Sequence, residues 1–120
     1  MRVTPTLPCS NNLAFESDVT VPDGSKVAPG ASMDKRWQVK NTGTCNWDAH
    51  YHFKLVDGNT LGAVSDQALN PARAGSEAIL RLLFTAPPDP GTYRSAWQAF
   101  GPDGQPFGDP VFIEVEVTTP

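Results

Sequence analysis

The stretch of residues 78–99, AILRLLFTAPPDPGTYRSAWQA, carries the main evidence for the fold. On each side of its Pro- and Gly-rich centre, the residues at every second position are apolar or small. A period of two places side chains on one face of a β-strand, whereas a helix would repeat every three to four residues. The stretch therefore predicts two strands separated by a turn. Their inward faces are Ala78, Leu80, Leu82 and Phe84, and then Tyr93, Ser95, Trp97 and Ala99.

The same alternation recurs along the rest of the chain at spacings of about ten residues. It predicts further strands around residues 15–21, 35–40, 51–55 and 111–117. Phe15 is expected on the inner face of the first, and Lys35 among the polar, solvent-facing neighbours of Trp37 in the second. This pattern predicts an all-β, immunoglobulin-like two-sheet antiparallel β-sandwich of about seven strands, with a closed barrel as the alternative.

Tyr93 sharpens this prediction because it directly follows the Pro90–Gly91 corner at the start of the penultimate strand. Sandwiches place a tyrosine corner there, and its hydroxyl group bonds back to the backbone of the preceding loop. We expect the structural core to consist of Tyr93 together with the aromatic residues on inward strand faces, which are Trp37, Phe84 and Trp97.

Charge and composition exclude several classes of partner. Nine Lys and Arg residues against thirteen Asp and Glu residues give a net charge of -4, and the basic residues form no run. The chain therefore lacks the cluster of positive charge that would bind nucleic acid or an anionic membrane surface, and we expect neither as a partner. No apolar stretch approaches the roughly 18 residues of a bilayer span, so we expect no membrane insertion.

Thr and Pro content predicts a linker over residues 1–12, a domain over 13–117, and the start of a second linker over 118–120.

No group of residues has the spacing of a catalytic or metal site. His50 and His52 could share one strand face, but no third ligand follows at the same phase, so solvent-facing histidines are the expected reading. Glu114 and Glu116 line one strand face instead of opposing each other across a cleft, as a glycosidase would require. We therefore expect that the chain is not an enzyme and that it holds no metal and no cofactor.

Cys9 and Cys45 are too few and too far apart for a zinc site built on paired cysteine units. A disulfide or two free thiols remain. Cys9 lies in the Thr/Pro lead-in and Cys45 in a polar turn, which favours the disulfide over two buried core thiols. Because such a bond persists in oxidising compartments, we expect an extracytoplasmic location, secreted or surface-anchored, in a longer chain.

Several spaced motifs resemble the four-tryptophan (FW) immunoglobulin-like domain over about residues 13–117. This is the central domain of the neighbour-of-BRCA family of selective-autophagy receptors, and it also occurs in bacterial extracytoplasmic proteins. The cysteine pair and the Thr/Pro lead-in resemble the secreted bacterial subtype. The resemblance implies a sandwich fold and a protein-binding role. The motifs are DVTVPDG at 18–24, KRWQVKNTGTCNW at 35–47, TAP at 85–87, PGTY at 90–93 and GQPFG at 104–108.

One position departs from the family pattern. The family name counts four tryptophans, and this chain has three, at Trp37, Trp47 and Trp97. The remaining one would lie just before Gly58, where this chain carries Asp57.

We expect the chain to be a non-catalytic module that binds a protein or peptide and is monomeric as an isolated domain. Trp47 follows a turn, and an exposed Trp is a strong interface anchor. The alternatives are a carbohydrate-binding module, which would stack sugar rings on a row of exposed aromatic side chains, and a structural spacer. The predicted partner contacts are Trp47, Tyr51, Phe100 and Phe107.

Overall fold

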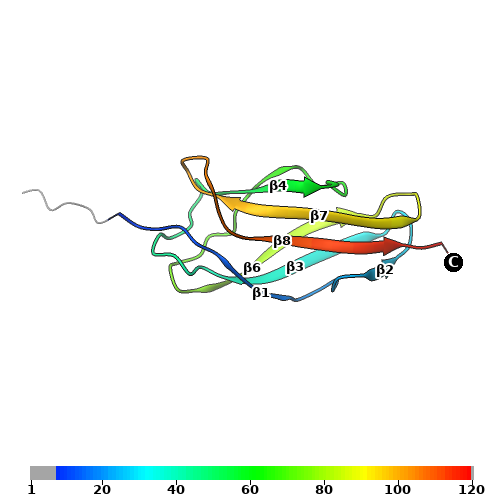
Figure 1. Cartoon of the computed structure of the whole chain (residues 1–120), viewed down its shortest axis with the longest axis horizontal. Helices are drawn as coiled ribbons and strands as arrows, with labels where there is room; N and C mark the ends of the chain where they lie inside the picture. Colours follow the sequence, from blue (N-terminus) through cyan, green and yellow to red (C-terminus); the bar gives the residue numbers. More distant parts are fainter. Residues whose placement is uncertain (1–7, 120) are drawn as a thin grey trace, which may run out of the picture.

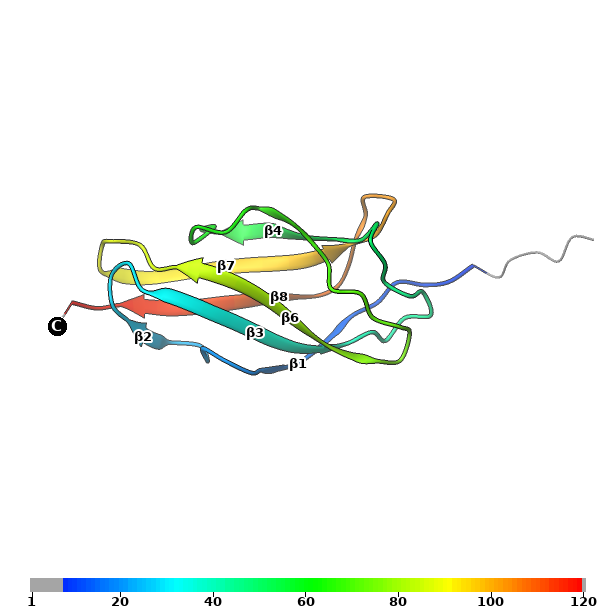
Figure 2. The same ribbon diagram turned by 180° about the vertical axis from the view of Figure 1, so that it is seen from behind.

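The computed structural model describes residues 8–119 and contains eight β-strands arranged in two layers (Figure 1). The described N-terminal segment and the C-terminus lie at opposite ends of the sandwich, as the reverse view also shows (Figure 2). The strands are β1 (Ala14–Asp18), β2 (Ser25–Val27), β3 (Ser32–Lys40), β4 (His52–Gly58), β5 (Asp66–Ala68), β6 (Glu77–Thr85), β7 (Gly91–Phe100) and β8 (Pro106–Val117).

One sheet has three strands in the order β1-β3-β6, and the other has five in the order β2-β8-β7-β4-β5. The predicted all-β, two-sheet sandwich is confirmed. Two details differ from the prediction: β2 and β5, of three residues each, raise the strand number to eight, and β2 pairs with β8 in parallel. The parallel pair arises because the chain leaves β1 in one sheet and crosses to the other sheet without reversing direction. Strands this short carry too few residues to show a period of two.

The core between the sheets is a closed ring of four aromatic side chains. Trp37 and Phe84 come from the three-stranded sheet, and Phe53 and Trp97 come from the five-stranded sheet. Ring centroids are 5.6 to 6.4 Å apart around this ring, mostly in edge-to-face geometry, which aromatic pairs favour. Trp37 also links the sheets directly, because its Nε1 donates a hydrogen bond to the carbonyl oxygen of Phe112 on β8 (2.9 Å).

Of the four residues expected in the core, Trp37, Phe84 and Trp97 are buried and Tyr93 is half-buried. The Tyr93 hydroxyl donates to the carbonyl oxygen of Asp89 (2.8 Å), which confirms the predicted tyrosine corner. Trp97 Nε1 donates to the hydroxyl oxygen of Ser95 (2.7 Å), and both residues are buried. The small polar residue at position 95 therefore serves the tryptophan two residues further along β7.

Lys35 is not a solvent-facing neighbour of Trp37, as its residue type predicted, but lies fully buried on the inner face of β3. Its Nζ donates to Asp18 Oδ1 (2.7 Å) and to the carbonyl oxygens of Thr20 (2.9 Å) and Val21 (2.8 Å). A buried ammonium group is tolerated only where its donors are paired, and here three acceptors meet its three donors. Lys35 faces inward because it lies two positions before Trp37 in the same strand. Its partners come from the last residue of β1 and from the chain between β1 and β2.

The segment before β1 is held across one end of the sandwich. Cys9 and Cys45 form a disulfide with their Cα atoms 4.9 Å apart, and Thr44 N and Cys45 N both donate to the carbonyl oxygen of Ser10. The Tyr51 hydroxyl donates to Asn11 Oδ1 (2.7 Å). Residues 1–7 of the predicted linker, and Pro120, lie outside the described residues. A disulfide of this kind persists in oxidising surroundings.

Candidate functional site

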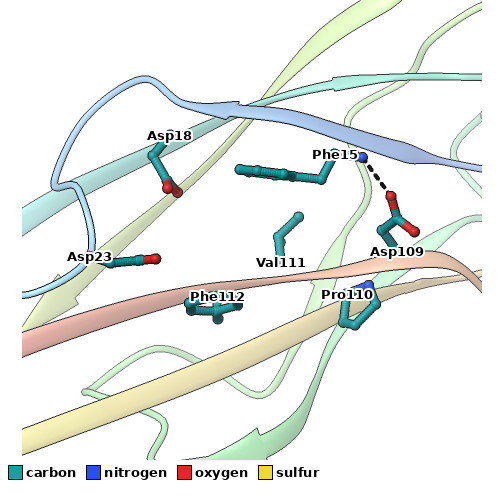
Figure 3. Close-up of a pocket in the computed structure, with 7 residues that line it drawn as sticks. All are labelled: Phe15, Asp18, Asp23, Asp109, Pro110, Val111 and Phe112. Atoms are coloured by element: carbon teal, nitrogen blue, oxygen red, sulfur yellow. Dashed lines mark hydrogen bonds between the residues drawn. The ribbon is translucent and has the colours of Figure 1, made fainter.

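The strands β1 and β8 lie at neighbouring positions of the two sheets (Figure 1). A groove lies between them, and Figure 3 shows the residues that line it. At one end the strands are tied together, since Asp109 N donates to the Leu13 carbonyl (2.9 Å) and Phe15 N donates to Asp109 Oδ2 (3.0 Å). Further along they separate, until Gly24 N donates to the carbonyl oxygen of Glu114 (3.0 Å) just before β2. The space between these two ties is a pocket of about 340 Å³, here called the β1–β8 groove.

The groove has an apolar middle and acidic ends. The Phe15 ring lies along it opposite Val111, while the carboxylates of Asp18 and Asp23 lie at one end and Asp109 at the other (Figure 3). Phe15 is 40% exposed, the only aromatic among the large exposed apolar side chains in residues 8–119. The remaining lining residues are Pro110 and Phe112.

The charges of the groove are unbalanced toward the negative. Asp18 is neutralised by Lys35 beneath it, and within residues 8–119 the Asp109 carboxylate accepts only the neutral amide of Phe15. None of the lining residues is basic. A ligand with an aliphatic stem and a cationic head would therefore match both the apolar middle and the acidic ends.

Two of the predicted partner contacts are buried and cannot offer surface in this conformation. Trp47 is 2% exposed and Tyr51 is 5% exposed. Trp47 forms an antiparallel bridge with Ala72, which turns its ring inward against Phe107, and Tyr51 packs edge-on against the same Phe107 ring. These three residues are brought together, but as internal packing at the end of the sandwich that carries the disulfide.

Phe100, the fourth predicted contact, is half-buried and takes no part in these ring contacts. Its ring is covered by the ammonium group of Lys54, which lies 4.9 Å from the ring centroid. None of the four predicted contacts lines the β1–β8 groove, so the sequence prediction missed this site. Phe15 and Asp109 are 94 positions apart in the chain, so no local pattern reports that they meet.

The histidines are exposed and each contacts one carboxylate. His52 Nδ1 lies 2.8 Å from Asp66 Oδ1, and His50 Nδ1 lies 3.2 Å from Asp48 Oδ1. The backbone amide of His50, followed by its ring, holds the pKa of Asp48 below its usual value. Within residues 8–119, no cluster of three or more His, Cys, Asp or Glu residues has the geometry to hold a metal ion. A helix with the length and apolar character of a bilayer span does not occur in that part of the chain either.

Two packed β-sheets, a tyrosine corner and a shared aromatic core define an immunoglobulin-like β-sandwich domain. Residues 20–117 match the family described as the Ig-like domain from next to BRCA1 gene, and the chain belongs to this family. The family is not enzymatic, which confirms the expectation that the chain is not an enzyme.

Relatives from animals and plants support the assignment. The chain is 33% identical to Next to BRCA1 gene 1 protein of Homo sapiens, in an alignment that covers 94% of this chain and 12% of that protein. It is 33% identical to Protein JOKA2 of Solanum tuberosum (86% of this chain, 12% of that protein). It is 32% identical to Protein NBR1 homolog of Arabidopsis thaliana (86% of this chain, 15% of that protein). The chain thus spans only a small part of the length of the curated relatives it matches.

Proposed function

We propose that this domain is a non-catalytic module that binds a protein partner, and that it does so by receiving an Arg or Lys side chain of the partner in the β1–β8 groove. The observation that carries the proposal is the arrangement of Phe15 and Val111 between Asp23 at one end and Asp109 at the other. The aliphatic stem of a basic residue would lie on the apolar middle, and its cation would meet a carboxylate.

The exposed apolar side chains support a protein partner over a carbohydrate. A sugar-binding face needs several exposed aromatic rings in a row, and here aliphatic side chains predominate. The large apolar residues exposed within residues 8–119 are Phe15, Val19, Val56, Val64, Ile79 and Leu83. Aliphatic residues of this kind add apolar contact area to a protein interface without the ring stacking that a sugar needs.

The Cys9–Cys45 disulfide supports an extracytoplasmic location for the protein that contains this domain. Thiols are kept reduced in the cytosol of most organisms, whereas secreted and surface proteins keep their disulfides. The secreted bacterial subtype of the family is the form that we propose for this chain.

The test uses two short peptides that differ in one charge, because the natural partner is not identified. One is Gly-Ser-Arg-Ser-Gly with blocked termini, and the other replaces Arg by its neutral isostere citrulline. We expect the Arg peptide alone to shift the backbone NMR signals of Phe15, Asp18, Asp23 and Val111. Asp23→Asn should weaken this binding by about tenfold or more, since a hydrogen bond to a charged group contributes roughly 1.5 to 3 kcal/mol.

The matched control is Asp57→Asn, which removes the same charge from an exposed residue of β4. It should leave the Arg peptide bound with unchanged affinity. Equal binding of the citrulline peptide would contradict the role of charge. If neither peptide shifts any groove residue, the spacer interpretation replaces the proposal.

A further inference from the structure

The outer edge of β6 is a second surface, separate from the β1–β8 groove because β1 and β6 flank β3 on opposite sides. The direction of its backbone groups follows from the register with β3, in which Arg36 lies opposite Arg81. Arg36 uses its own N–H and C=O toward β1, bonding Thr20 Oγ1 (2.8 Å) and Val19 N (2.9 Å). In an antiparallel pair, a residue whose partner bonds away from the pair also bonds away. Arg81 therefore directs its N–H and C=O to the free edge of the sheet.

Because strand residues alternate in direction, Ile79, Leu83 and Thr85 also direct their N–H and C=O groups to the free edge. At two points along this edge, another part of the chain forms a hydrogen bond with β6. Asn70 Nδ2 donates to the carbonyl oxygen of Ile79 (2.9 Å), and Thr85 N donates to the carbonyl oxygen of Leu61 (2.8 Å). Between these points, the edge-facing N–H and C=O groups of Arg81 and Leu83 have no hydrogen-bond partner among residues 8–119.

The residues that carry these open backbone groups also border a shallow depression. Arg81, Leu82 and Leu83 line a pocket of about 430 Å³. Its other wall consists of Gly62, Ala63 and Val64 in the loop before β5, and of Gln67 in β5. Val64 and Leu83 are 69% and 63% exposed, more than any other large apolar side chain in the described residues. An apolar surface thus borders the unpaired donors and acceptors.

Edge strands are normally guarded against pairing by a charge or a proline on the open side. On β6 the charged side chain at the open stretch is Arg81, and it points away from the edge. Arg81 bonds Asp34 on β3 with both Nε (2.8 Å to Oδ1) and Nη2 (3.0 Å to Oδ2), so its guanidinium group lies over the face of the sheet.

We propose that this open edge of β6 accepts an extended segment of a partner protein as an added β-strand. The backbone of the segment would pair with Arg81 and Leu83, and apolar side chains at alternate positions would pack on Leu83 and Val64. A second copy of this chain fits less well, because residues 62–67 of that copy lie beside its own β6 and would have to fit into the same space. The open stretch spans only two edge-facing residues, which suits a short, flexible segment.

The test uses capped hexapeptides in which Thr alternates with Val, Leu or Phe. We expect at least one of them to shift the backbone NMR signals of Arg81 and Leu83 and to slow hydrogen exchange at both amides. Methylating the edge-facing peptide nitrogens leaves every side chain in place but removes the ladder. It should weaken binding by about tenfold or more, the effect of losing one or two hydrogen bonds.

The variant Leu83→Lys restores a guarding charge at an exposed side chain, so the fold should be unaffected. It should also weaken peptide binding by about tenfold or more. Val19→Lys is the matched control, since it adds the same charge at another exposed apolar residue near β1 and should leave binding unchanged. The proposal is overturned if no peptide shifts these signals, or if the methylated peptides bind equally well. Concentration-dependent self-association that Leu83→Lys abolishes, without peptide binding, would assign the edge to a second copy instead. Because the groove peptides test a different surface, either proposal can fail alone.

Discussion

Lys35 Nζ lies 2.7 Å from Asp18 Oδ1, inside the sandwich, with no exposed side-chain surface on the lysine. The same ammonium group holds the carbonyl oxygens of Thr20 and Val21. It therefore fastens the segment in which the chain leaves the three-stranded sheet and crosses to β2. That segment leads to Asp23, so one buried cation stabilises the fold and also supports the acidic end of the β1–β8 groove.

Replacing Lys35 by Met should lower the free energy of unfolding by about 3 to 5 kcal/mol, because Asp18 and the two carbonyl groups lose their donor. The measurement is urea denaturation followed by tryptophan fluorescence. Lys40→Met, at an exposed position of the same strand, should change stability by less than about 0.5 kcal/mol. Equal effects of the two substitutions would contradict a structural role for the Lys35 cation.

Two tryptophans in the core differ in one hydrogen bond. Trp37 Nε1 donates to the Phe112 carbonyl, whereas Trp47 Nε1 is buried without a partner among residues 8–119. Trp37→Phe and Trp47→Phe remove the same atoms, but only the first leaves a buried acceptor unpaired. We expect Trp37→Phe to be more destabilising by about 1 to 2 kcal/mol in chemical denaturation. A larger loss for Trp47→Phe would indicate that its N–H has a partner in solution.

Alkylation before and after reduction tests the disulfide. In protein from an oxidising compartment, intact mass should record no alkylated thiol after denaturation, and two after reduction. The double variant Cys9→Ser and Cys45→Ser should be less stable by about 3 to 4 kcal/mol, because the bridge closes a loop of this size in the unfolded chain. Two thiols that alkylate without reduction would contradict the bridge and the proposed extracytoplasmic location together.

Asp34 makes stability depend on acid pH. Hydrogen bonds from Arg81 and Arg36 lower its pKa from 3.8 to about 2. A pKa that is lower in the folded state stabilises the protein above the unfolded value, and this contribution is lost as pH falls from about 5 toward 2. The difference in melting temperature between the parent and Asp34→Asn should therefore shrink over that range. Because the Asp34 side chain is only half-buried, the effect should be modest and should weaken in high salt. With Asp57→Asn as the control, we expect no such convergence.

The strands β3, β6 and β8 could be predicted because buried and more exposed residues alternate along each of them. In β6 and β8 the buried residues recur strictly at every second position, as at Leu80, Leu82, Ile113 and Val115. Tyr93 could also be predicted, because the tyrosine corner is a local relation between a side chain and a loop four residues earlier.

The site could not be predicted in the same way, because it depends on relations between distant segments. Lys35 follows the inward period of β3, but lysine is rarely buried. Its partners lie 14 to 17 residues earlier, at the end of β1 and in the irregular segment after it. Phe15 has a core-like residue type but lies where β1 separates from β8, so its ring is left at the surface. Trp47 follows a turn, and its burial depends on Ala72, which no pattern near Trp47 reports.

The disulfide also determines how the domain would respond to mechanical tension. The described N-terminal segment and the C-terminus leave at opposite ends, so a pull on both runs along the strands (Figure 1). Force that enters at Cys9 passes through the sulfur atoms to Cys45 and bypasses β1, β2 and β3. The bridge spans a sequence separation of 36 residues, which would otherwise extend by roughly 120 Å. An oxidised domain would therefore lengthen by roughly 120 Å less on forced unfolding than a reduced one.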